Sequence, residues 1–302
     1  MIVVAALLMA YAALVGTLGR LLLSRLTGRT GDPLLGAMVW LVACGSVLTA
    51  SLGAGLLAAG WHLPAFAAAV VEGCLTRAEW PHDHVHVAMP ELALPVMAAS
   101  VLRAAWVTVR GYATEVQIRH RHVRAVRLVG RASRDLGAMV VDAPEPAVYC
   151  VAGAHPTIVV TTRALRTLSP AALAAVLAHE RCHLAERHHL LLRACHLLAR
   201  AFPFVPLFRD ARSRIAGLLE MRADDVAARR HGVRPLVDAL TAVVAGPPNR
   251  TALGAGGVSA RARVDRLLTD PSGTPRGRWR LSLLTVAFAA APAVILLVPF
   301  CD

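Results

Sequence analysis

Two long apolar segments dominate the first 60 residues of the chain. Met1 to Leu23 is almost uncharged and is followed by Arg25, and Leu34 to Gly60 contains no charged residue. Each is long enough to cross about 30 Å of hydrocarbon as a helix, at about 1.5 Å per residue. No basic residue precedes the first segment, which argues against a cleaved signal peptide. We therefore expect membrane helices over about 1–23 and 34–60.

Two further segments complete the predicted membrane region. Leu281 to Phe300 is apolar throughout and follows three arginines. The segment from about Val85 to Val109 is interrupted by Glu91 and Arg103, and a charge in the membrane interior costs a few kcal/mol on insertion scales. We include it because an even number of spans places every arginine-rich loop on one face.

The arginines also predict the orientation of the chain, because basic residues in short loops mark the cytoplasmic face. The linker between the first two segments, the stretch 110–134 and the approach to Leu281 are rich in arginine, whereas 61–84 has more acidic than basic residues. We expect both termini outside the cell. Residues 1–110 would form a membrane region with three spans, and 111–275 a soluble cytoplasmic domain.

Composition agrees with a membrane protein, since 56% of the residues are hydrophobic and 17% are charged. The net charge of +13 could attract nucleic acid, but aromatic residues make up only 5% and no recognition motif accompanies the arginines. We therefore expect the lipid bilayer, and not nucleic acid, as a direct partner.

The soluble block begins with strand-like segments and continues with helices. Ala125 to Val141 and Ala147 to Val160 contain β-branched runs near glycine and proline. Further helical patterns cover Ala171 to Leu184, Leu190 to Leu207, Arg212 to Arg230 and Ser259 to Leu268. Arginines and prolines in 190–207 favour a membrane-dipping or core helix over a fifth span. The predicted fold class is a mainly α membrane protein, with four transmembrane helices and a cytoplasmic α+β domain.

The helix over 171–184 carries the sequence His179-Glu180-Arg181-Cys182-His183. Residues four apart share one face of a helix, so His179 and His183 can bind the same zinc ion. Glu180 would lie beside them and accept a proton from the attacking water, as peptide hydrolysis requires. The alternative is a pair of surface histidines in a histidine-rich stretch.

A catalytic zinc ion needs a third protein ligand, which Glu220 could supply from a second helix. Asp224, one turn further on, could accept the outer N–H of a ligand histidine. The alternative for these acidic residues is a solvated face that pairs with nearby arginines. Arg230 and His231 are candidate stabilisers of the oxyanion.

The chain resembles the BlaR/MecR-type antirepressor metallopeptidases of bacterial membranes and, more distantly, the HtpX-type and CAAX prenyl protease membrane peptidases. The resemblance rests on the order of spans and on the segments LSPAALAAVLAHERCHLAERHH, LLEMRADDVAARR and ARVDRLL. It implies a gluzincin-type domain, with His179, His183 and Glu220 as zinc ligands, Glu180 as general base and Asp224 as a supporting carboxylate. It also implies a plasma-membrane endopeptidase that cleaves a cytoplasmic protein, such as a winged-helix transcriptional repressor.

Two differences from that family bear on this prediction. His188 stands where family members often carry an aspartate, and we expect no extracellular penicillin-binding sensor domain after the last span. A quality-control protease for membrane proteins and a non-catalytic scaffold that holds zinc structurally remain alternatives. Glu180 counts against the scaffold, because a structural site needs no base.

Two outer features invite separate hypotheses. His82, His84 and His86 alternate along a loop and could bind zinc or copper, although a polar surface loop explains them as well. Cys74 and Cys301 are both predicted outside, where a disulfide could join them. Cys182, within the zinc motif, is expected to be a small packed residue rather than a ligand.

Overall fold

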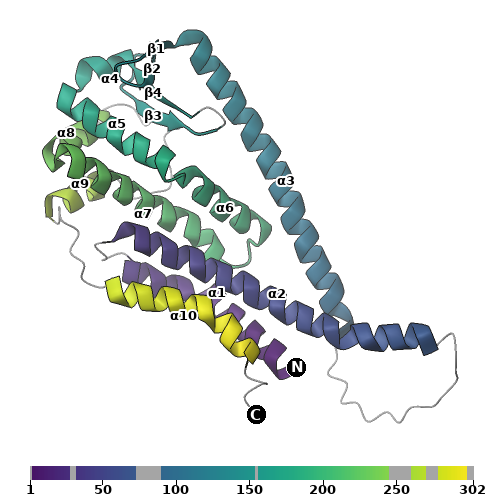
Figure 1. Ribbon diagram of the computed structural model, residues 1–302. Helices are drawn as coiled ribbons and strands as arrows, with labels where there is room; N and C mark the ends of the chain where they lie inside the picture. The colour runs from purple at the N-terminus through teal and green to yellow at the C-terminus, as the bar shows by residue number, and fades with distance from the viewer. Residues whose placement is uncertain are drawn as a thin grey trace.

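The computed structural model describes residues 2–27, 32–72, 90–153, 156–244, 260–269 and 278–297. These ranges are mainly helical, with one four-stranded sheet at the end of the molecule far from both termini (Figure 1). The helices are α1 (Ile2–Thr27), α2 (Pro33–Glu72), α3 (Pro90–Val129), α4 (Thr162–Thr167), α5 (Pro170–Ala185), α6 (His188–Ala201), α7 (Pro206–His231), α8 (Val233–Val244), α9 (Ala260–Thr269) and α10 (Arg278–Leu297).

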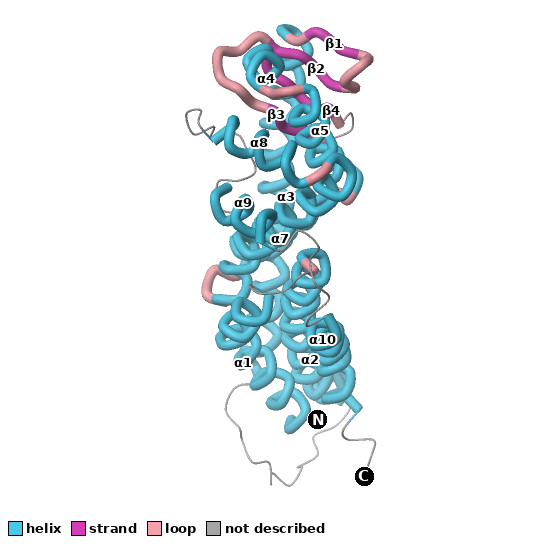
Figure 2. The backbone as a smooth tube through the Cα atoms, turned by 90° about the vertical axis from the view of Figure 1, so that its left-hand side faces the viewer, coloured by secondary structure: helices cyan, strands magenta, loops and turns pink. Residues whose placement is uncertain are grey.

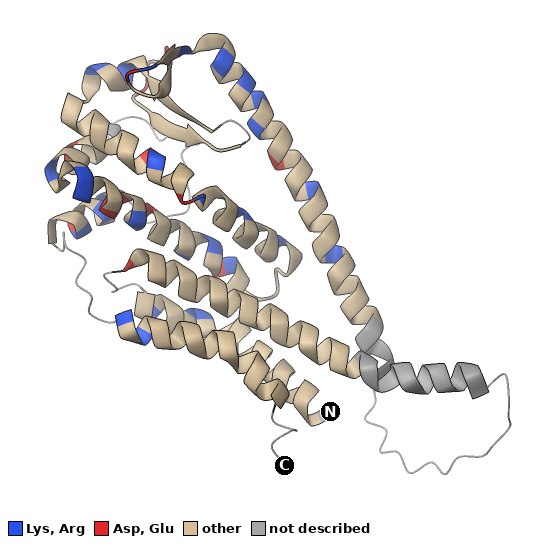
Figure 3. Ribbon diagram, in the orientation of Figure 1, with Lys and Arg blue, Asp and Glu red and all other residues tan. Residues whose placement is uncertain are grey.

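Among the described residues, three helices are long and apolar enough to cross a membrane: Val3–Thr27, Pro33–Ala58 and Arg278–Leu297. They correspond to the spans predicted at 1–23, 34–60 and 281–300. Figure 3 shows α2 and α10 almost free of charged side chains, which gather on the rest of the molecule. The three helices pack side by side (Figures 1 and 2).

The predicted third span lies in α3, which is not among these three helices. Residues 85–89 of that span lie outside the described residues. From Pro90, α3 continues without a break to Val129, so the boundary predicted at 111 falls inside a helix.

The strand-rich segment predicted over Ala125 to Val141 contains two strands, Arg131–Ser133 and Ala138–Val141, but its first five residues are the last turn of α3. Val123 and Val126 lie three residues apart on one face of α3, and Val126 is packed against the buried Val151 and Val159 of the sheet. Helical burial of these side chains outweighs the preference of β-branched residues for strands.

Residues 61–72 of the segment predicted as an outer loop belong to α2, which continues to Glu72. The hypotheses about His82, His84 and His86 and about a disulfide between Cys74 and Cys301 concern positions outside the described residues.

The sheet consists of β1 (Arg131–Ser133), β2 (Ala138–Val141), β3 (Val148–Val151) and β4 (Thr157–Thr161), in the order β1-β2-β4-β3. β2 and β4 are parallel, and β3 is an edge strand antiparallel to β4. Ile158 and Val160 pack against α5 through Val176 and Leu177. The other face, with Val159, packs on α3. The sheet is therefore held between α3 and the helix that carries the zinc motif.

The segment predicted over Leu190 to Leu207 is not one continuous helix, because α6 ends at Ala201 and α7 begins at Pro206. The α6–α7 hairpin packs against the membrane helices, and Leu207, Phe208 and Ile215 share a buried core with α1 and α2. A Cβ placed on Gly16, in the middle of α1, would lie 3.3 Å from Val205 Cγ1. This contact joins the turn between α6 and α7 to the apolar helix α1.

Candidate metal centre

The zinc motif lies on α5, whose start is fixed by a side-chain cap and a proline. The Ser169 hydroxyl accepts a hydrogen bond from the backbone N–H of Ala172 at 3.2 Å, and Pro170 occupies the first turn. One turn apart on the buried face, His179 and His183 are only 6% and 4% exposed. Burial excludes the alternative of two solvated surface histidines.

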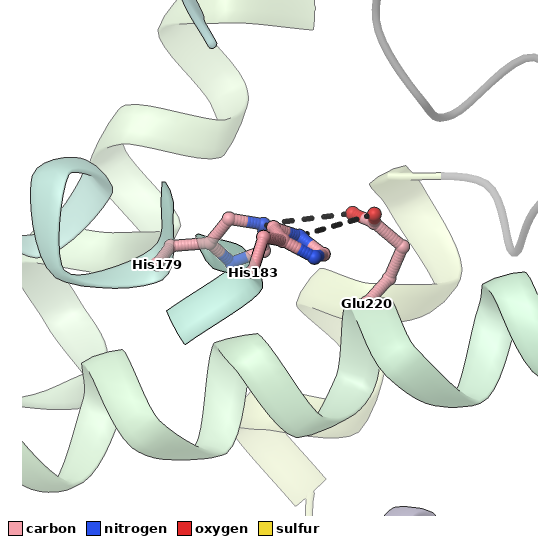
Figure 4. Close-up of side chains that lie close together, drawn as sticks. All are labelled: His179, His183 and Glu220. Atoms are coloured by element: carbon pink, nitrogen blue, oxygen red, sulfur yellow. Dashed lines mark hydrogen bonds and ion pairs between the residues drawn. The ribbon is translucent and has the colours of Figure 1, made fainter. Parts of the chain in front are cut away.

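Glu220 reaches the two histidines from α7, which packs beside α5 (Figure 4). The Nε2 atoms of His179 and His183 lie 3.0 Å apart, and the Glu220 carboxylate oxygens lie 3.6 Å and 3.4 Å from them. Zinc ligands bonded at about 2.0–2.2 Å in a tetrahedron lie about 3.3–3.6 Å apart. The three side chains therefore fit one zinc ion.

Asp224 lies one turn after Glu220, and its Oδ1 is 3.0 Å from His179 Nδ1. This carboxylate is fully buried and accepts two hydrogen bonds from Arg263, at 2.7 Å from Nε and 2.6 Å from Nη2. The third nitrogen of the guanidinium, Nη1, lies 2.8 Å from a Glu220 oxygen. Arg263 on α9 thus holds both carboxylates in place.

His183 is oriented by a separate chain of contacts. Its Nδ1 lies 2.8 Å from Nδ1 of His188, which is 1% exposed, and His188 Nε2 lies 3.1 Å from Glu186 Oε2. Arg222 donates to Glu186 from Nε and Nη2. Arg187 has a left-handed backbone (φ 52°) in the turn between α5 and α6, which brings His188 back beside His183. Each of the two histidines therefore has its Nδ1 within 3.0 Å of a supporting side chain and its Nε2 directed to the centre.

Glu180 lies at the edge of this centre and is anchored by the sheet. Its Oε2 accepts a hydrogen bond of 3.0 Å from the backbone N–H of Cys150 in β3. The carboxylate is only partly buried, so it remains accessible to water. This is the position that a general base for hydrolysis needs.

The charges around the centre favour a bound cation. Burial opposes a charged His179, but Asp224, Glu220 and Glu180 outweigh burial and raise the pKa of His179 to about 10. Burial would also raise the pKa of Asp224, yet the hydrogen bonds from Arg263 hold it below its usual range. Around the centre there are thus three carboxylates and one guanidinium, that of Arg263. A bound zinc ion would take the place of the proton on His179.

Cys182, Glu186 and His188 form a second group with donor atoms within 4.8 Å of one another. Glu186 forms an ion pair with Arg222, and Nδ1 of His188 is in contact with His183. Cys182 is buried, in agreement with the packed residue expected from the sequence. These contacts make the group a support for His183.

Arg230 and His231 lie in the last turn of α7, and their proposed role as oxyanion stabilisers stays a prediction. His231 lies eleven residues beyond Glu220 on α7, which is about 16 Å along the axis. Arg230 is exposed to solvent. The guanidinium at the centre belongs to Arg263, within the segment ARVDRLL.

Sequence reasoning also missed the contact between His183 and His188. His188, which differs from the aspartate frequent in the resembling family, is buried beside a proposed ligand. Its neighbours in the sequence are Arg187 and His189, so the local pattern does not mark it as a buried residue.

Comparison with curated proteins and with solved structures gave no match. The family model of peptidase family M48 matches residues 113–230. These residues run from the second half of α3, through the sheet and α5, to the end of α7, and they include all four residues proposed as ligands and base. The match supports a metallopeptidase domain of the M48 type in this part of the chain.

Proposed function

We propose that the chain is an integral-membrane zinc endopeptidase. The observation that carries the proposal is the arrangement of His179, His183 and Glu220 at tetrahedral spacing, with Glu180 beside them. A structural zinc site usually closes its fourth position with a protein ligand. No fourth donor from the described residues joins this group of three.

Zinc held by these residues would polarise the substrate carbonyl and lower the pKa of water. Glu180 would take a proton from the attacking water as its oxygen bonds to the carbonyl carbon. It would then pass the proton to the amide nitrogen as the C–N bond breaks. The Cys150 N–H keeps the Glu180 carboxylate in position for both transfers, and Arg263 keeps Glu220 ionised and in place.

We also propose a regulatory role, with a cytoplasmic protein such as a winged-helix transcriptional repressor as the substrate. The resemblance to the antirepressor peptidases supports this role. The proposed catalytic domain also follows arginine-rich segments that are expected to be cytoplasmic, which would place it on the side of a cytoplasmic substrate. The competing function is quality control of membrane proteins, which the same residues would serve. Sequencing of protein N-termini in cells with the wild-type chain or Glu180→Gln separates them, because a regulator would generate few cleavages and a quality-control protease many.

The topology is a proposal as well: four spans, both termini outside and the domain with the metal centre in the cytoplasm. We expect alkaline phosphatase fused after Asp302 to be active and a fluorescent protein at that position to stay dark. A fluorescent protein fused after Leu240 should be bright, because that point belongs to the cytoplasmic domain. The opposite pattern at either point would contradict this orientation.

His188→Phe is expected to weaken zinc binding about 10- to 100-fold, as is typical when the outer partner of a ligand histidine is lost. The reason is that the ring of His183 would lose its contact at Nδ1. Competition with a chromophoric chelator measures the affinity. His120→Phe, on the exposed side of α3, is the control. Equal affinities for the two variants would contradict the supporting role of His188.

A further inference from the structure

A groove of about 360 Å³ lies next to the metal centre, between α3 and the edge strand β3. One wall contains Tyr149, Cys150 and Ala152, and the facing wall contains Glu115 and Arg119 of α3. The proposed ligand His183 lies on the wall of the same groove, which therefore leads directly to the centre.

The strand wall of the groove can pair with an extended peptide. β3 pairs with β4 on one side only, and the Cys150 N–H points away from β4 towards Glu180. In an antiparallel pair, alternate residues point their backbone groups to the same side. The backbone groups of Val148 and Ala152 therefore point to the same side of β3 as those of Cys150, and Cys150 and Ala152 line the groove. Because the Cys150 N–H is bonded to Glu180, a peptide would pair with the Cys150 carbonyl and with the backbone of Ala152. Edge strands of this kind bind extended segments by adding a strand.

The acidic side chain of the helical wall is already paired with positive charge. Glu115 is the acidic residue of the groove, and two arginines share it, Arg119 at 3.9 Å and Arg193 at 3.5 Å. Burial lowers the pKa of His189, which also lines the groove, and the nearby positive charges of Arg119, Arg193 and Arg187 lower it further. An added carboxylate would meet an attractive potential here.

Arg119 is the arginine best placed to meet a bound segment. It lines the groove, and a Cβ placed on Gly153, just after β3, would lie 3.3 Å from Arg119 Cδ. The distance from Arg119 to its partner Glu115 is 3.9 Å, which is long for an ion pair. The Arg119 side chain is 24% exposed. The guanidinium therefore has hydrogen-bonding capacity left for a ligand.

We propose that the groove selects extended peptide segments with an acidic side chain close to the cleaved bond, and that Arg119 is the residue that recognises this side chain. The inference rests on the proposed peptidase function and adds the substrate class. An acidic side chain would complete the pairing of Arg119 with a charge-assisted hydrogen bond.

The test is digestion of a proteome-derived peptide library by the purified full chain, with the new ends identified by mass spectrometry. We expect Asp and Glu to be enriched at one position near the cleaved bond. Arg119→Glu should replace this preference with one for Lys and Arg. Matched quenched peptides that differ only by Glu or Gln at that position give one kcat/KM value each. The kcat/KM of the Glu peptide divided by that of the Gln peptide should be about tenfold lower for Arg119→Gln than for the wild type.

Arg124→Gln is the matched control, because Arg124 is an exposed arginine of α3 outside the groove. It should keep the wild-type preference. Zinc content and the circular dichroism spectrum verify that each variant is folded, and the milder Arg119→Gln provides the result if Arg119→Glu misfolds.

The peptidase function and the acidic preference can be contradicted by different results. Cleavage that depends on Glu180 but shows no acidic preference, or keeps that preference in both Arg119 variants, would overturn the inference and leave the peptidase intact. Absence of any cleavage that depends on Glu180 would overturn both.

Discussion

Glu180→Gln is expected to reduce peptide hydrolysis by the purified protein about 10²- to 10⁴-fold while leaving its zinc content unchanged. Glutamine keeps the size of the side chain and can still accept the hydrogen bond from Cys150, but it cannot accept the proton of the attacking water. The measurements are kcat on a peptide that the wild type cleaves and zinc content by atomic absorption.

Two further variants make this result specific. Glu145→Gln, at an exposed glutamate of the same domain, should keep wild-type activity and zinc content. His183→Ala should lose both, because it removes a proposed ligand. If Glu180→Gln retained full activity, hydrolysis would use another base, and the proposed mechanism would be wrong.

The cluster at the centre could be anticipated because it depends on local rules. Positions four apart on a helix share a face, which brings His179 and His183 together, and the same spacing relates Glu220 to Asp224. The contact between the two helices does not follow from these local rules. It was expected only because a catalytic zinc ion needs a third protein ligand. The structure places Glu220 within 3.6 Å of both histidines.

The supporting residues could not be anticipated, since they come from distant segments. Arg263 lies on α9 and reaches Asp224 across 39 residues of sequence. Nothing in its local sequence pattern distinguishes it from Arg266, which pairs with Asp225 through Nη1 and Nη2. Tertiary packing alone decides which of the two arginines meets the centre.

In the fold as well, local features could be predicted, whereas features that depend on contacts between distant segments could not. Three apolar helices were predictable from length and lack of charge. The continuation of α3 to Val129 was not, because its last turn has the composition of a strand and becomes helical through burial of Val126 against the sheet. The groove between α3 and β3 follows from that continuation, so the role proposed for Arg119 could not be predicted from the sequence.

Arg263→Met should destabilise the zinc-free protein by about 3–5 kcal/mol, the loss expected when one partner of a buried ion pair is removed. Asp224 is fully buried and Glu220 is 8% exposed, so both carboxylates would lose a guanidinium that water cannot replace. Thermal unfolding with a chelator present, followed by circular dichroism, measures the loss. The melting temperature should fall by about 6–20 °C.

Arg266→Met is the matched control, one turn along α9. Its partner Asp225 is paired through two oxygens as well, but the Asp225 side chain is 17% exposed and that of Asp224 only 1%. Since water can partly solvate Asp225, the control should lose much less stability. The double variant Arg263→Met with Asp224→Asn should recover part of the loss, because it removes the uncompensated charge. Equal losses for Arg263→Met and Arg266→Met would show that burial of the carboxylate does not set the strength of the pair.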